Sequence, residues 1–291
     1  MKRLCTGAAL VGFALVACQT AQTQSEPQVI VVPPDEMSRD PSIVPGSVAK
    51  PMSSAPSQPP TDHASLPPQT PPALAPSLKY SYTSCNVEGP YIAITFDDGP
   101  SAQLTPRLLD ILKERGIRAT FFVVGRNVAE YPDIVRRMDS EGHEIANHSW
   151  SHPALTQMGA EGLRKQIENT NDAIEKITGK RPSLMRPPYG ATSSTLNRRF
   201  TEDYRLKVIL WSVDPLDWKY RNANRVYSSI TQNTQPGSII LAHDIHATTV
   251  AAMPSTLDTL TAKGYKFVTV SELISRELPE QLVKKEPAAA R

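Results

Sequence analysis

The chain has 291 residues, and its 31 Lys and Arg residues nearly balance its 29 Asp and Glu residues, for a net charge of +2 at pH 7. The basic residues are scattered along the chain rather than gathered in one stretch. This gives no basic surface of the kind that nucleic-acid-binding proteins use, so we expect no nucleic-acid partner.

The first residues have the pattern of an export signal. A basic tripeptide precedes an apolar stretch over residues 7–17, which is too short to span a bilayer. The stretch ends in LVAC, which resembles the lipobox of bacterial lipoproteins. We therefore expect a lipoprotein signal peptide at residues 1–17 and a lipid anchor on Cys18. The protein would then lie in the bacterial cell envelope, and Gln19 favours the outer membrane, facing the periplasm. An ordinary signal peptide is the alternative.

Residues 18–84 are predicted to form a disordered linker. The segment from residue 19 to residue 79 holds 14 of the chain's 27 prolines and no Phe, Trp or Tyr. Such a composition cannot bury enough apolar surface to offset the entropy that is lost on ordering. We expect an extended, proline-rich tether before the domain, and a short disordered tail at residues 281–291.

The folded domain is predicted at residues 85–280, where strands and helices alternate. Strands are expected at 91–96, 119–125, 143–149, 182–190, 207–213, 237–244 and 264–270. Helices are expected at 105–116, 131–142, 160–179, 192–204, 224–233, 248–263 and 271–278. Apolar strands separated by helices indicate an α/β fold with a parallel sheet, and seven strands favour a barrel with one unit missing over an open sheet. No glycine-rich phosphate motif follows the first strand, so no nucleotide cofactor is expected.

Polar and aromatic side chains follow five of these strands at their carboxyl ends. The segments are Asp97-Asp98, HSWSHP at 148–153, RPPYG at 186–190, DPLDW at 214–218 and LAHD at 241–244. Barrel enzymes place their active sites at this rim. His148 and His152 are four residues apart, so one turn can direct both imidazoles at one ion, and Asp98 would complete a set of ligands with open positions. The absence of a GxSxG motif disfavours a serine esterase.

In this order, TFDDGP, HSWSHP, RPPYG, DPLDW and LAHD resemble the five motifs of the polysaccharide deacetylase domain (NodB homology, carbohydrate esterase family 4). The resemblance spans residues 91–270 and includes every key residue of the motifs. It implies a deformed (β/α)7 TIM-like barrel. It also implies a metal-dependent hydrolase that removes N-acetyl groups from sugar polymers, with zinc as the usual ion and cobalt or another divalent ion as alternatives.

The resemblance assigns roles to the residues at the rim. The metal ligands would be Asp98, His148 and His152. Asp97 would be the general base for the attacking water, and Arg186 would orient it. His243 would be the general acid that protonates the leaving amine, and Asp214 would hold and charge His243.

Other residues would bind the substrate. The backbone N–H of Tyr189 would help to hold the oxyanion, while Trp218 and Leu241 would line the slot for the acetyl methyl group. Asp217 and Asp244 are expected to shape loops rather than to take part in the chemistry.

The expected substrate is a glycan that contains N-acetylglucosamine, with peptidoglycan first because a lipid anchor and a long tether would place the domain near the wall. Exported poly-N-acetylglucosamine, a chitin-like oligomer and O-acetylated xylan are alternative substrates. A glycan-binding envelope protein without catalysis is the alternative function, but it predicts a missing base or ligand.

Overall fold

The computed structural model of the protein describes residues 79–279. The predicted signal peptide, the lipidation site at Cys18, most of the predicted linker and the predicted tail at 281–291 lie outside the described residues. No helix between residues 79 and 279 combines the length and the apolar character that a bilayer crossing requires.

The strands of the described part form one eight-stranded sheet in which all strand pairs are parallel. They are β1 (Ser81–Tyr82), β2 (Tyr91–Asp97), β3 (Thr120–Val123), β4 (Glu144–Asn147), β5 (Leu184–Met185), β6 (Lys207–Ile209), β7 (Ile239–His243) and β8 (Lys266–Phe267). Their order is β1-β6-β5-β4-β3-β2-β7, and β8 pairs with the beginning of β2. The predicted parallel α/β fold is confirmed.

The sheet closes into a deformed barrel between β6 and β7. The chain that continues from β6 reaches β7 through a single parallel bridge between Val213 and Ile240. The N–H of Leu241 donates to the carbonyl of Val213 at 2.9 Å, and the N–H of Ser212 donates to the carbonyl of Ile239 at 3.0 Å. This narrow seam joins the segment after β6 to β7 and closes the barrel.

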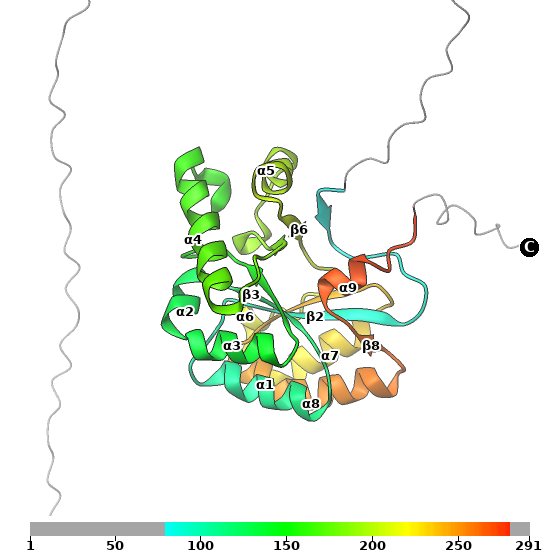
Figure 1. The fold of residues 1–291 in the computed structure, drawn as a ribbon. Helices are drawn as coiled ribbons and strands as arrows, with labels where there is room; N and C mark the ends of the chain where they lie inside the picture. The colour runs from blue at the N-terminus through cyan, green and yellow to red at the C-terminus, as the bar shows by residue number, and fades with distance from the viewer. Residues whose placement is uncertain (1–78, 280–291) are drawn as a thin grey trace, which may run out of the picture. The chain divides into compact units, whose positions relative to one another are not determined.

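Helices cover the outside of the barrel. They are α1 (Leu104–Glu114), α2 (Gly125–Glu130), α3 (Pro132–Ser140), α4 (Ala160–Thr178), α5 (Ser194–Tyr204), α6 (Asp217–Tyr220), α7 (Ala223–Asn233), α8 (Ala247–Ala262) and α9 (Val270–Ile274). Figure 1 shows α1, α3, α7 and α8 together on one side of β2, with α9 and β8 near the beginning of that strand. This arrangement leaves the carboxyl ends of the strands to form the rim.

The alternation of side chains along β2 decides what faces the helices and what faces the barrel interior. Ile92, Ile94 and Phe96 pack into the large apolar cluster shared with α1, α3, α7 and α8. The odd-numbered residues point to the other face, so the buried polar side chains of Thr95 and Asp97 lie inside the barrel. The parallel register then places Asp97 directly opposite His243 of β7. Two chemistry-bearing residues therefore meet at the inner rim.

Three elements were missing from the sequence prediction. Residues 81–82 were assigned to the linker, but they form β1 and pair with β6, so the predicted domain start at residue 85 is too late. Helices α2 and α6 are short, with six and four residues, and their sequences carry no helical periodicity. Both follow strand ends and both contribute to the site described below.

Gly237 and Gly264 allow a matched test of backbone packing, because both have positive φ angles, of 80° and 88°. A Cβ at position 237 would overlap the carbonyl oxygen of Cys85, whereas one at position 264 meets nothing within 4 Å. Gly264→Ala should lower the free energy of unfolding by about 1–2 kcal/mol, the cost of a left-handed residue. Gly237→Ala should cost about 1–3 kcal/mol more through overpacking. Urea denaturation of both variants measures this, and equal losses would contradict the packing argument.

Candidate active site

A pocket of about 530 Å³ opens at the carboxyl ends of the strands. It is lined by Asp97, Asp98, His148, His152, Pro187, Tyr189, Gly190, Trp211, Asp214, Trp218, Leu241 and His243. The pocket brings together every predicted chemical and substrate-binding residue of the rim except Arg186. That residue is fully buried and contacts Asp97 from inside the barrel.

Asp98, His148 and His152 form a compact cluster in which one ligand atom from each residue lies within 4.8 Å of the others. Asp98 Oδ1 is 3.4 Å from His148 Nε2 and 3.3 Å from His152 Nε2. Asp98 and His152 have positive φ angles of 74° and 60°, which bring their side chains to the cluster from two irregular loops. Left-handed backbone at non-glycine residues is costly, and it is often found at functional sites.

The protonation states of this cluster suit a cation. His148 Nδ1 lies 2.6 Å from the carbonyl oxygen of Arg186, which can only accept, so Nδ1 carries the proton and Nε2 is free to bind. Burial and the neighbouring His148 lower the pKa of His152, which favours its neutral form. Burial raises the pKa of Asp98, but the hydrogen bond and charge of His148 outweigh it and bring the pKa to about 2. One carboxylate and two imidazoles whose Nε2 atoms lie beside that carboxylate are a fitting donor set for a divalent metal.

Asp97 is held by Arg186 inside the barrel. Arg186 Nη1 donates to Asp97 Oδ1 at 2.6 Å and to Thr95 Oγ1 at 2.8 Å. The second carboxylate oxygen, Oδ2, faces the cluster of Asp98, His148 and His152 and lies 3.8 Å from His148 Nε2. Asp97 is only 3% exposed, so the guanidinium compensates a carboxylate that has lost nearly all its water.

His243 is paired with Asp217. Its Nδ1 lies 2.7 Å from Asp217 Oδ1, and its backbone N–H donates to Asp217 Oδ2 at 2.9 Å. Thr249 Oγ1 donates to the same Oδ2 at 2.7 Å, which fixes the carboxylate. Burial lowers the pKa of His243, but the hydrogen bond and charge of Asp217 raise it to about 9. The imidazole is therefore protonated at neutral pH.

The prediction that Asp214 holds His243 is wrong. Asp214 Oδ1 instead accepts from the backbone N–H of Leu216 at 2.7 Å and shapes the turn before α6. Leu216 has a φ of 53°, and this turn directs the following Asp217 inward, where it is fully buried. The expectation that Asp217 only shapes a loop fails for the same reason. Spacing in DPLDW could not decide between the two acids, because the choice depends on one left-handed residue.

The walls of the pocket include one residue that the sequence analysis missed. Trp211 lines the pocket beside Gly190, where an added Cβ would lie 2.8 Å from the indole. The sequence pattern places it in the apolar strand predicted at 207–213, and no local signal marks it as a pocket residue. Trp218 and Tyr189 are 50% and 71% exposed, so both have surface that a ligand could cover. Leu241 is almost fully buried, and it also lines the pocket.

Replacing Asp217 by Asn should lower the pKa of His243 from about 9 toward its ordinary value of 6.5, because the carboxylate that raises it most is lost and only the weaker effects of Asp97 and Asp98 still oppose burial. NMR titration of the His243 ring in the metal-free protein measures this. Asp214→Asn is the matched control and should leave that pKa within a few tenths of the parent value. A larger shift for Asp214→Asn than for Asp217→Asn would restore the original assignment.

Comparison with known proteins finds the same domain elsewhere. The family model described as "Polysaccharide deacetylase" matches residues 85–208. The peptidoglycan-N-acetylglucosamine deacetylase PgdA of Listeria monocytogenes is 46% identical over 187 residues, which cover 64% of this chain and 39% of the relative. A peptidoglycan-N-acetylglucosamine deacetylase of Bacillus cereus is 37% identical over 203 residues, which cover 67% of this chain and 72% of that protein.

A solved structure agrees in fold. The peptidoglycan deacetylase PdaC of Bacillus subtilis superposes with a TM-score of 0.61 at 45% identity, over 64% of this chain and 90% of that one. The chain spans about two fifths of the length of the first curated relatives that it matches. Its match to the Bacillus cereus protein covers most of both sequences. The chain therefore belongs to the polysaccharide deacetylase family.

Proposed function

We propose that this protein is a metal-dependent deacetylase of peptidoglycan, which hydrolyses the acetamido group of N-acetylglucosamine to a free amine and acetate. The observation that carries this proposal is the meeting of a three-residue metal cluster, a buried carboxylate and a protonated imidazole in one pocket. Relatives named as peptidoglycan-N-acetylglucosamine deacetylases and peptidoglycan-N-acetylmuramic acid deacetylases support the substrate class.

The proposed metal is zinc, bound by Asp98, His148 and His152. Two imidazoles and one carboxylate form a zinc ligand set that leaves positions open for water and substrate. Bound there, the ion would polarise the acetyl carbonyl and lower the pKa of the attacking water. Cobalt or another divalent ion is compatible with the same donors.

Asp97 is the proposed general base. Its Oδ1 is occupied by Arg186, so Oδ2 is the atom that accepts the proton from the attacking water. The short contact with Arg186 fixes the carboxylate in one orientation, because the guanidinium is itself held by backbone carbonyls of Ile209 and Leu210. A base in a fixed orientation removes the entropy cost of finding the correct geometry in the transition state.

His243 is the proposed general acid. Asp217 holds its Nδ1, so Nε2 is the atom that donates a proton to the leaving nitrogen as the C–N bond breaks. With a pKa of about 9 the ring is charged at neutral pH and loses its proton as the pH rises through that value. The acid and the base lie opposite each other on β7 and β2, so both reach one bound acetamido group.

The remaining pocket residues would position the acetyl group. Tyr189 has a φ of 62°, and we propose that its backbone N–H binds the oxyanion that forms on the acetyl oxygen. Leu241, Trp211 and Trp218 would enclose the methyl group, which gives a small apolar slot with few polar groups.

The location is proposed to be the cell envelope, with a lipid anchor at Cys18 and the outer membrane as the site of attachment. The support is the signal-like leader with its LVAC sequence, Gln19, and the proline-rich segment that follows. Such a segment would let a membrane-attached domain reach glycan strands some distance away.

Replacing Asp97 by Asn should lower the rate of acetate release by about 100- to 10,000-fold, because the base is lost while the shape is kept. Purified peptidoglycan and chitooligosaccharides are the substrates, with and without chelator. Asp133→Asn, an exposed carboxylate on α3, is the control and should keep the parent rate. If the metal-loaded parent releases no acetate from either substrate, the proposed substrate class is wrong.

Cys18→Ser should abolish incorporation of labelled palmitate when the full-length protein is made in cells, because the thiol is the proposed attachment atom. Cys5→Ser, in the same leader, is the matched control and should retain the label. An ordinary signal peptide would leave the parent protein without label and would contradict the lipoprotein assignment.

A further inference from the structure

The three proposed metal ligands come from two loops that have no regular secondary structure. Asp98 lies in the loop after β2, whereas His148 and His152 lie in the loop after β4. Left-handed residues occur in both loops, with φ angles of 74° at Asp98 and 66° at Ser149. The distance between the ligands therefore depends on contacts that hold the two loops relative to each other.

The turn at residues 124–127, where α2 begins, contacts the Asp98 loop at two points. The side-chain amide Nδ2 of Asn127 donates to the carbonyl oxygen of Asp98 at 2.8 Å. The backbone N–H of Val124 donates to the carbonyl oxygen of Gly99 at 3.0 Å. The Asp98 carbonyl belongs to the peptide unit next to the Asp98 side chain, and the Gly99 carbonyl belongs to the following one.

The same turn binds the histidine loop. The N–H groups of Gly125 and Arg126 donate to the carbonyls of Ser149 and Trp150 at 2.9 and 3.0 Å. The approach is close enough to favour glycine, since a Cβ at position 125 would lie 2.5 Å from Trp150 Cε3 of that loop. The turn at residues 124–127 is thus hydrogen-bonded to both ligand-bearing loops at once.

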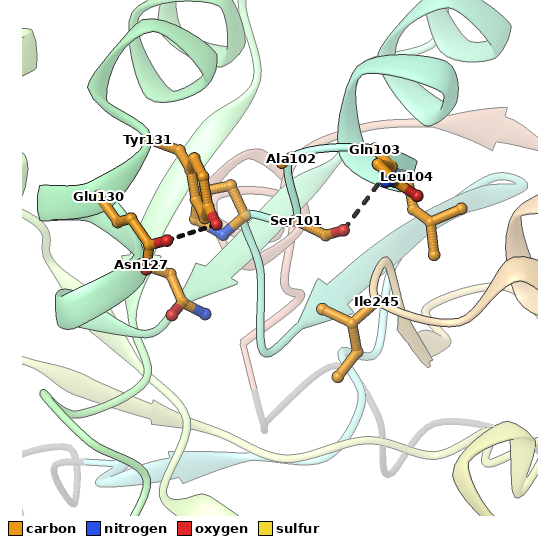
Figure 2. Close-up of a pocket in the computed structure, with 9 residues that line it drawn as sticks. Ser101, Ala102, Gln103, Leu104, Asn127, Glu130, Tyr131 and Ile245 are labelled. Atoms are coloured by element: carbon orange, nitrogen blue, oxygen red, sulfur yellow. Dashed lines mark hydrogen bonds between the residues drawn. The ribbon is translucent and has the colours of Figure 1, made fainter. Parts of the chain in front are cut away.

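Asn127 supplies the side-chain hydrogen bond of this set, and the other three hydrogen bonds join backbone groups. Figure 2 shows Asn127 on the wall of a second cavity, of about 390 Å³, together with Glu130, Tyr131 and Ile245. The residue is half-buried, so its side chain can be exchanged without opening a hole in the apolar core.

We propose that Asn127 is a positioning residue for the metal centre. By binding the Asp98 carbonyl from a turn that also holds the histidine loop, it keeps Asp98 Oδ1 within reach of His148 Nε2 and His152 Nε2. The inference rests on the proposed function only in taking these three residues as the metal ligands. It concerns metal affinity, which is measured separately from turnover.

The test is calorimetric titration of the metal-free full-length protein with Zn²⁺, and with Co²⁺ as a spectroscopic probe. Asn127→Leu, which has a similar volume and no donor, should raise the Kd for both ions by about 10- to 100-fold, the usual effect of removing an outer partner of a ligand. The visible spectrum of bound Co²⁺ should change in the same variant. Glu130→Gln, on the same cavity wall without a contact to Asp98, should bind like the parent protein.

A second variant covers the case in which Asn127→Leu does not fold. Asn127→Asp keeps the shape of the side chain and replaces the donor by an acceptor, so it should weaken metal binding at least as much. A Kd within twofold of the parent in either folded variant would overturn the inference, even if the thermal stability of the metal-free protein fell. A parent protein that binds neither ion would instead contradict the proposed function.

Discussion

Arg186 is the residue on which both halves of the site depend. Its side chain is fully buried. The guanidinium donates hydrogen bonds to Asp97, to Thr95 and to the backbone carbonyls at the end of β6, those of Ile209 and Leu210. Its cation also stacks on the ring of Phe122 at 4.1 Å. The backbone carbonyl of Arg186 also accepts a hydrogen bond from the Nδ1–H of His148. One residue therefore fixes Asp97, the proposed base, with its side chain and His148, a proposed metal ligand, with its backbone.

A charge in this position is expensive unless it is fully paired. Removing one partner of a buried ion pair costs about 3–5 kcal/mol, whereas replacing the whole pair by apolar side chains is often neutral. Stability alone therefore gives no reason to keep Arg186 and Asp97 in the interior of a barrel. The proposed function gives one, because a general base acts best in a fixed orientation, and the ion pair with Arg186 holds Asp97 in one.

Much of the fold follows from sequence patterns, because apolar strands and amphipathic helices alternate at a regular spacing. The seven predicted strands all occur, although all of them except β2 are shorter than predicted, and β5 and β8 have two residues each. The five motifs placed the chemical groups at the correct rim, since parallel strands end together. The contacts that the sequence could not predict depend on the backbone conformation of a few single residues. The left-handed backbone of Leu216 places Asp217, rather than Asp214, beside His243. Helix α2 has only six residues and no periodic pattern, so the contacts of its first turn could not be predicted.

The seam of the barrel has a consequence for how such a site can diverge. Between β6 and β7 the wall is joined by one bridge and its flanking hydrogen bonds, and residues on both sides of it, Trp211 and Leu241, face the pocket. The pairing of β2 with β7 is longer and extends over five residue pairs, which include Asp97 and His243. Side chains along the seam can thus be exchanged, and the cavity reshaped for a different ligand, without disturbing the pairing that places Asp97, the proposed base, opposite His243, the proposed acid.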